Sequence, residues 1–284
     1  MPDLAATVGR LRTLRPEYAD TYSVRIGVPA EPGWRTMAEL GASEIGKWCA
    51  LALETENPRR LASVAATAVG GTLIHAVLGR VTAALVLEQR AWEVSATNLA
   101  VHCDGEQTAV RDAGLFVLLG DPAAGGANAE VLPDLGALLD RVAAAAVATL
   151  APLLDAVRAA TRYGAVPLWN AAADSVRSAA AYVPIYTGTD RRAARELGDA
   201  LVDALVAHGA RARGRGGRQP VVWREEPYDL PVRAACCLYY KTEPQVDRPA
   251  DRYCLTCPFL DPADRVARFG VFVDGLCAPT SAAP

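Results

Sequence analysis

Four cysteines near the C-terminus have the residue types and spacing of a metal or redox site. Cys236 and Cys237 are adjacent, sixteen residues follow, and Cys254 and Cys257 then form a C-x2-C turn followed by Pro258. Thiolates are soft ligands that suit zinc and iron–sulfur clusters, and a C-x2-C turn brings two sulfurs to one centre. We call these four residues the cysteine site, and their pattern predicts a bound iron–sulfur cluster.

Two other chemistries remain open for the cysteine site: a tetrahedral zinc ion and a redox dithiol. Structural zinc sites usually combine two C-x2-4-C turns, and the adjacent pair Cys236 and Cys237 fits that pattern poorly. Consecutive side chains of a regular strand point to opposite faces, so two neighbouring ligands require a bent backbone. The spacing therefore favours a cluster held by all four cysteines, and it predicts a bend at the adjacent pair.

The motifs around these cysteines resemble the FhuF-like ferric siderophore reductases, cytoplasmic bacterial proteins with a C-terminal [2Fe–2S] cluster. The resemblance rests on R-x-x-C-C-L-x-Y at residues 233–240 and on C-x-x-C-P at residues 254–258. It is weaker at residues 166–172, VPLWNAA. The spacer of 16 residues between Cys237 and Cys254 is longer than the family's. Because extra loop length adds little closure entropy, we expect ligation to be retained and access to the cluster to change.

The resemblance implies a one-electron reduction of a ferric siderophore, with hydroxamates as the expected substrates. Siderophore oxygens hold Fe(III) tightly and the softer Fe(II) weakly, so reduction would release iron in the cytoplasm. The chain has neither a GxGxxG motif nor a P-loop, so the electron is expected from an external donor such as a ferredoxin or a flavin reductase. The alternative is a non-catalytic siderophore-binding or redox-sensing protein whose cluster or zinc ion is structural.

Five residues outside the cysteine site are candidates for contact with the substrate. The resemblance places Trp169 and Asn170 at the substrate, with core packing an equal alternative for Trp169. Tyr239, Tyr240 and Lys241 directly follow the cysteine pair and are expected beside the cluster.

Composition narrows the class of protein. The chain has 284 residues, of which 51% are hydrophobic and only 6% aromatic, and this composition favours a core of Ala, Leu and Val on helices. A net charge of −3 argues against a nucleic-acid binder. No secretory signal precedes the first apolar stretch, and the longest apolar run, residues 142–154, is too short to cross a bilayer. We therefore expect a cytoplasmic protein without a transmembrane segment.

The elements that position these residues are predicted to form a mostly helical α+β fold. Helices are expected at residues 3–14, 36–53, 58–87, 133–162, 166–182 and 190–207, with a small sheet within residues 91–119. Short strands at 220–224 and 232–241 and a helix at 262–269 follow. The predicted organisation is a mainly helical domain (1–208), a Gly- and Arg-rich linker (209–220), a loop-rich iron–sulfur segment (221–277) and a disordered tail (278–284).

The remaining candidates have structural interpretations. His75 lies in an apolar helical run and is expected to pack, and Cys49 is expected in the core. Cys277 is a spare thiol. The segment that holds the linker arginines is interpreted as a solvated loop, and an acidic electron donor is the functional partner that suits it best. These arginines are Arg211, Arg213, Arg215 and Arg218.

Overall fold

The computed structural model of the chain describes residues 3–13, 21–55, 59–103, 105, 107–213, 216–242 and 252–277. The fold is α+β and mostly helical, as predicted. The predicted tail at 278–284 and most of the long spacer lie outside the described residues. The helices are α1 (Leu4–Thr13), α3 (Ala42–Thr55), α4 (Ala62–Ile74), α5 (Arg80–Glu88), α6 (Leu135–Thr161), α7 (Ala165–Thr187), α8 (Arg191–Ala207) and α9 (Pro262–Cys277).

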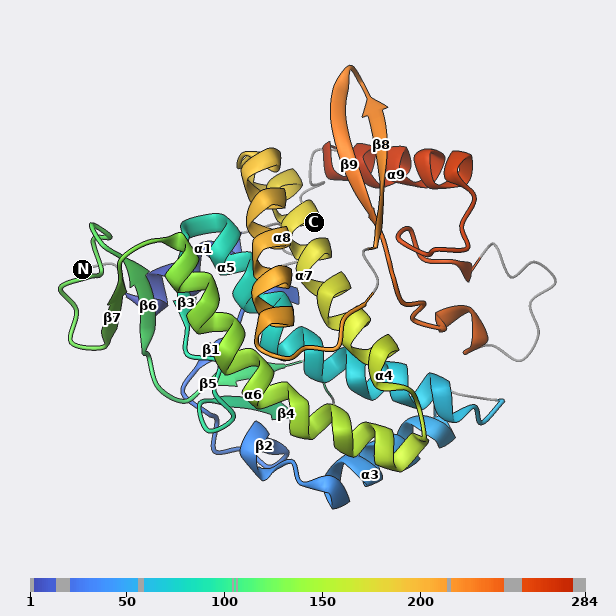
Figure 1. Cartoon of the computed structure of the whole chain (residues 1–284), viewed down its shortest axis with the longest axis horizontal. Helices are drawn as coiled ribbons and strands as arrows, with labels where there is room; N and C mark the ends of the chain where they lie inside the picture. The colour runs from blue at the N-terminus through green and yellow to red at the C-terminus, as the bar shows by residue number, and fades with distance from the viewer. Residues whose placement is uncertain are drawn as a thin grey trace, which may run out of the picture.

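The core lies where α6, α7 and α8 pack beside one another and against α4 and α5 (Figure 1). The apolar side chains that these helices bury are mostly alanine, leucine and valine, which agrees with the composition. The small residues allow close approach: a β-carbon on Gly70 would come 2.7 Å from the Leu168 side chain. Gly70 therefore marks a close helix contact and not a break, because α4 continues past it to Ile74.

Helices α4 and α5 form one continuous helical stretch, Ala62–Glu88, joined by a π-helical turn at His75–Gly79. The His75 ring fills the space beside Gly79, where an added β-carbon would lie 2.2 Å from its Nδ1. Its Nε2 lies 2.8 Å from the Thr21 carbonyl oxygen, and Tyr22 packs against the ring. His75 thus has the structural role that the sequence predicts.

His75 should make stability fall in mild acid. Burial and the charge of Arg80 lower the pKa of His75 to about 4, from an ordinary value of 6.5, although the bond to Thr21 opposes this. Because the unfolded chain takes up the proton first, stability should be lost as the pH falls from 6.5 to 4, by up to about 3 kcal/mol. Urea titrations of wild type and His75→Gln across this range measure the effect. A loss of equal size in both proteins would contradict it.

Two small sheets cover one end of the helices (Figure 1). The first has the order β1-β5-β4-β2, with β1 and β5 parallel and the other pairs antiparallel. The second has the order β3-β6-β7, with β6 and β7 parallel. The strands are β1 (Arg25–Ile26), β2 (Trp34–Thr36), β3 (Ala91–Trp92), β4 (Leu99–His102), β5 (Thr108–Val110), β6 (Leu115–Leu118) and β7 (Ala129–Leu132).

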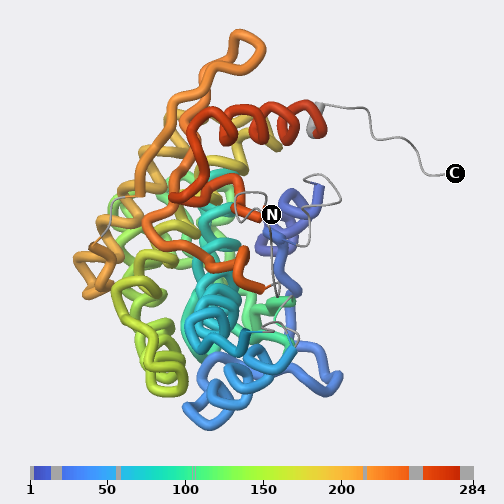
Figure 2. Tube along the Cα trace, turned by 90° about the vertical axis from the view of Figure 1, so that its right-hand side faces the viewer, coloured from blue at the N-terminus to red at the C-terminus, as the bar shows by residue number. Residues whose placement is uncertain are grey.

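The C-terminal part begins with a hairpin of β8 (Gly217–Trp223) and β9 (Glu226–Val232), against which α9 packs. Phe269 of α9 is fully buried there, with its ring 4.9 Å from that of Tyr228. Figure 2 shows this segment, in orange and red, crossing one side of the helical part. The exposed linker is shorter than predicted, because β8 begins at Gly217 and Ala210 is buried in the main core.

The strand predicted over residues 232–241 is wrong. The second strand of the hairpin is β9, which ends at Val232, and the chain then bends toward the cysteine pair. Pro227 and Pro231 lie within β9, and prolines in a sequence argue against a strand because they cannot donate a backbone hydrogen bond. Each strand of a two-stranded sheet has one edge without a partner strand, however, and a proline without an N–H is tolerated there.

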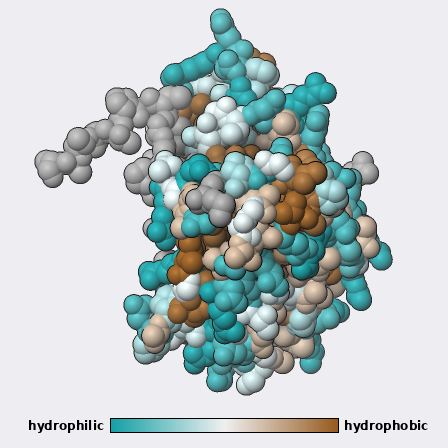
Figure 3. Space-filling view, turned by 90° about the vertical axis from the view of Figure 1, so that its left-hand side faces the viewer, coloured by the Kyte–Doolittle hydropathy of each residue, from teal (hydrophilic) through white to brown (hydrophobic). Residues whose placement is uncertain are grey.

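Two helical stretches, Ala62–Glu88 and Leu135–Thr161, are long and apolar enough to cross a membrane by length and composition alone. In the most apolar windows of these two stretches, 78% and 50% of the residues are buried inside the protein. Buried core helices pass the same test, so the absence of a transmembrane segment stays a prediction. The face seen in Figure 3 is mainly polar, with separate apolar patches.

Candidate functional site

The cysteine site draws its sulfurs from two segments that are far apart in sequence. The Sγ atoms of Cys237 and Cys254 lie 3.9 Å apart, and all four thiols are free. Cys236 lies close enough to Cys257 for the charge of Cys257 to contribute to the raised pKa of Cys236. The structure therefore brings all four predicted ligands together, although sixteen residues separate the two pairs.

The backbone bend predicted at the cysteine pair is present. Leu238 adopts the left-handed conformation, with φ at 58°, and a 3-10 turn, Tyr239–Lys241, follows it. The bend aims backbone donors at the sulfurs: the Leu238 N–H lies 3.4 Å from the Cys236 Sγ, and the Tyr239 N–H donates to Cys237. Such donors stabilise thiolates, which are the form that binds metal.

Two polar side chains of the core helices hold the cysteine pair in place. Asp174 of α7 is 3% exposed, and its two carboxylate oxygens accept the N–H groups of Ala234 and Ala235, each at 2.9 Å. Thr67 of α4 donates its hydroxyl to the Cys237 carbonyl at 3.0 Å. The segment that carries the adjacent cysteines is therefore fixed to two helices of the main core.

A single arginine of α9 holds the C-x2-C turn. Arg265 is 4% exposed and donates to the carbonyl oxygens of Cys257 at 2.7 Å, Leu260 at 2.9 Å and Leu255 at 3.2 Å. It also contacts Gln219 of β8. Because one guanidinium satisfies three carbonyls of the turn, the position of Cys257 depends on α9 and on the hairpin.

The sulfurs are electrostatically coupled. Hydrogen bonds shared with Cys236 and Cys254 lower the pKa of Cys237, and the same bonds raise the pKa values of Cys236 and Cys254. The shared bonds therefore favour deprotonation of Cys237 over deprotonation of Cys236 or Cys254. A cation at this place would bind the deprotonated form.

Aromatic and cationic side chains surround the cysteine site. Burial, and then the charges of Cys236 and Cys257, raise the pKa of Tyr240, and the rings of Tyr240 and Tyr253 meet edge to face at 5.3 Å. Tyr239 and Phe259 are more than half exposed. The cations of Arg252 and Lys241 lie over the rings of Tyr239 and Tyr240, at 5.5 and 5.7 Å. Three of the five predicted substrate residues, Tyr239, Tyr240 and Lys241, therefore lie at the site.

The other two predicted substrate residues are buried. Trp169 is 5% exposed within the main core, and Asn170 is 8% exposed. The Asn170 side chain accepts the Arg213 N–H at 3.0 Å, so it fixes the segment between α8 and β8. Core packing, the alternative left open for Trp169, agrees with its position.

Sequence reasoning missed Asp174, Arg265 and Thr67, the three residues that hold the cysteine segments. Asp174 had a detectable signal, because a lone carboxylate in the alanine-rich stretch AAADSVRSAAA lies four residues after Asn170 and so on the same helix face. No comparable signal marks Thr67 or Arg265, since their partners are backbone carbonyls.

The spacing of the cysteine sulfurs can be compared with the geometry of a metal ion or an iron–sulfur cluster. Within the described residues, no group of three or more His, Cys, Asp or Glu side chains is spaced to hold a single metal ion. Two thiolates on one tetrahedral metal lie about 3.8 Å apart, given a metal–sulfur bond of about 2.3 Å. The Cys237 and Cys254 sulfurs have that spacing, and a two-iron cluster needs only two thiolates on each iron. One pair of sulfurs therefore has the spacing of two ligands on one iron, and a [2Fe–2S] cluster on all four cysteines stays a prediction.

Comparisons with protein-family models, with curated proteins and with solved structures find no match for this chain. The resemblance to FhuF-like reductases rests on the sequence motifs at residues 233–240 and 254–258, with weaker support at 166–172.

Proposed function

We propose that the protein is a ferric siderophore reductase that holds a [2Fe–2S] cluster on Cys236, Cys237, Cys254 and Cys257. The observation that carries the proposal is the convergence of four free thiols from two distant segments, at a place held by the buried side chains of Asp174 and Arg265. When bound, such a cluster exchanges one electron at a time. A one-electron change at Fe(III) is sufficient to weaken its siderophore complex.

The residues of this chain have distinct tasks in that proposal. Asp174, Thr67 and Arg265 fix the two cysteine segments, and the N–H groups of Leu238 and Tyr239 stabilise negative charge on the sulfurs. The exposed rings of Tyr239 and Phe259 provide an apolar contact surface beside the site. An external donor such as a ferredoxin or a flavin reductase would dock at the same face, where Arg252 and Lys241 attract an acidic partner.

A spectroscopic experiment tests the proposal. The protein, purified without chelators, should be red-brown, contain two irons and two sulfides per chain, and bleach on addition of dithionite. Its reduced form should show the electron paramagnetic signal of a [2Fe–2S] centre. When a ferric hydroxamate is then added to the reduced protein without oxygen, the oxidised spectrum should return as an Fe(II) chelator develops colour.

Three results would contradict the proposal at different points. A colourless protein that contains one zinc per chain would favour a structural site. A free dithiol without metal would favour thiol redox chemistry. A cluster that stays reduced while the ferric chelate persists would leave a cluster protein without reductase activity, as in the binding or sensing alternative.

A further inference from the structure

A groove of about 650 Å³ lies between helices α7 and α8 and the β8–β9 hairpin. One wall is apolar, formed by Ala181 and Ile185 of α7 with Val221 and Leu230 of the hairpin. The volume is that of a small-molecule site. None of the residues predicted from sequence as substrate contacts lines it, so the groove requires its own explanation.

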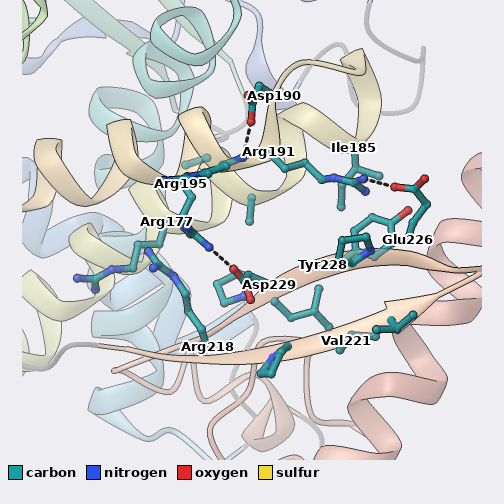
Figure 4. Close-up of a pocket in the computed structure, with 18 of the residues that line it drawn as sticks. Arg177, Ile185, Asp190, Arg191, Arg195, Arg218, Val221, Glu226, Tyr228 and Asp229 are labelled. Atoms are coloured by element: carbon teal, nitrogen blue, oxygen red, sulfur yellow. Dashed lines mark hydrogen bonds and ion pairs between the residues drawn. The ribbon is translucent and has the colours of Figure 1, made fainter.

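Arginines from three elements line the other side of the groove (Figure 4). At one end, Arg191 forms an ion pair with Glu226 at 2.5 Å and packs over the Tyr228 ring at 4.3 Å. Arg195 pairs with Asp229 nearer the middle. Each of these two cations has one carboxylate on the hairpin, so they account for how α8 holds the hairpin.

The other end of the groove has an excess of positive charge. Arg177 and Arg218 both form an ion pair with the carboxylate of Asp199. The Arg177 Nε lies 3.5 Å from the Asp199 Oδ1. A carboxylate oxygen of the nearby Asp174 lies 3.8 Å from the Arg233 Nε, and the charge of Arg177 also acts on this carboxylate. Three guanidinium groups therefore face two carboxylates. Positive groups therefore outnumber negative ones at this end of the groove, and a further negative charge would be attracted there.

Arg177 also has an unused donor. Its side chain is 12% exposed, and its Nη1 is buried without a hydrogen-bond partner among the described residues. A buried donor without a partner costs stability, and a ligand oxygen would remove that cost. A carboxylate matches the planar donor fork of arginine. The groove thus combines a carboxylate-binding end with an apolar wall.

This end of the groove lies beside the segment that leads to the cysteine site. Gly216, two residues before Arg218, lies so close that an added β-carbon would be 3.2 Å from Asp174 Oδ1 and 3.4 Å from the Ala234 nitrogen. Ala234 is two residues before Cys236. Two residues span at most about 7 Å, so Gly216, two residues from the groove residue Arg218, lies close to the cysteine pair.

We infer that the groove binds an organic anion through a free carboxylate held by Arg177 and Arg218, with the body of the molecule on the apolar wall. On the proposed function, on which this step rests, the ligand is an iron(III) chelate that retains a carboxylate. The chain then prefers anionic chelates to neutral ones of the same size.

Two matched probes test this inference without any electron transfer. N-succinyl- and N-acetyl-desferrioxamine B, loaded with Ga(III), are redox-inert complexes that differ mainly in one terminal carboxylate. Calorimetry with the purified full chain should show roughly tenfold tighter binding of the succinyl complex, the gain from one charge-assisted contact. Arg177→Gln and Arg218→Gln should each abolish the preference. Arg192→Gln is the matched control, because this residue lines the same groove but pairs with Glu196 and is 80% exposed.

Equal affinities of the two complexes for the wild-type protein would overturn the inference, as would a preference that survives in both Arg177→Gln and Arg218→Gln. Because Arg218 is one-third exposed, its variant keeps the test valid if Arg177→Gln fails to fold. The Fe(III) forms of the same chelates separate this inference from the proposed function. Reduction of both chelates at equal rates and affinities removes only the groove inference. A carboxylate preference without reduction removes only the reductase activity.

Discussion

Replacement of Cys254 or Cys257 by serine should abolish the stable visible spectrum of the protein. Each substitution removes one of four thiolates and offers a hydroxyl, a harder ligand with a much higher pKa. Cys257 is 2% exposed, so no solvent ligand can easily take its place. Loss of an outer hydrogen bond alone costs about 10–100-fold in metal affinity, so loss of a ligand should lower iron and sulfide per chain by at least about tenfold. Absorbance, metal analysis and the dithionite-reduced paramagnetic signal measure the change.

Two other cysteines provide matched controls for these variants. Cys49 is buried in α3 and Cys103 is exposed at the end of β4, and neither belongs to the cysteine site. Cys49→Ser and Cys103→Ser should keep the full spectrum, although the hydroxyl buried at position 49 should cost about 1–3 kcal/mol of stability. Loss of colour in either control, or its retention in Cys254→Ser, would show that the ligands have been assigned incorrectly.

The helices could be predicted because their signals are local. Long apolar periodicity marks α6, α7 and α8, and Asp190 caps α8 as its position suggests, since it accepts the N–H groups of Arg192 and Ala193. α9 was predicted too short: its apolar positions continue to Val273, which packs against the hairpin. Helix ends that depend on such long-range packing cannot be read from local periodicity.

The meeting of the four cysteines could be predicted from the sequence, whereas the residues that hold them could not. Cysteine spacing marks the four thiols, and the physical conflict between adjacent side chains and a common centre predicts a bend at the cysteine pair, which the structure has at Leu238. The strand that leads into this bend was misplaced because its prolines conceal it. Thr67 and Arg265 act on backbone groups that every residue carries, so only the tertiary structure identifies them.

The role of Arg218 in the groove could not be predicted from the sequence either. Arg218 had been interpreted as part of a solvated linker, yet it belongs to β8 and pairs with Asp199 of α8. Composition alone describes a Gly- and Arg-rich segment as a flexible loop. What changes the interpretation is that Arg177, forty-one residues earlier, shares the same carboxylate.

Replacement of Asp174 by alanine should destabilise the C-terminal part. The variant leaves the N–H groups of Ala234 and Ala235 without their acceptor, and an unpaired buried donor costs about 1–3 kcal/mol. Burial raises the pKa of Asp174, although hydrogen bonds and arginine charges lower it, so burial of the charged carboxylate costs stability. Its removal therefore recovers part of the free energy lost with the two hydrogen bonds. A net loss of about 2 kcal/mol in urea unfolding is expected. Asp155→Ala, which breaks an exposed ion pair of α6, should cost less than about 0.5 kcal/mol.

The pH dependence of Asp174→Asn distinguishes this buried carboxylate from an ordinary surface charge. A raised pKa means that the folded protein binds the proton more tightly than the unfolded chain does. The contribution of Asp174 is therefore full below its ordinary pKa of 3.8 and is lost as the pH rises through the folded value. Asparagine does not titrate, so the stability difference between wild type and Asp174→Asn should be greatest near pH 3.8 and should shrink toward pH 7. A difference that grows with pH would mean that Asp174 is held chiefly by its ion pair with Arg233, and that its bonds to the cysteine segment are secondary.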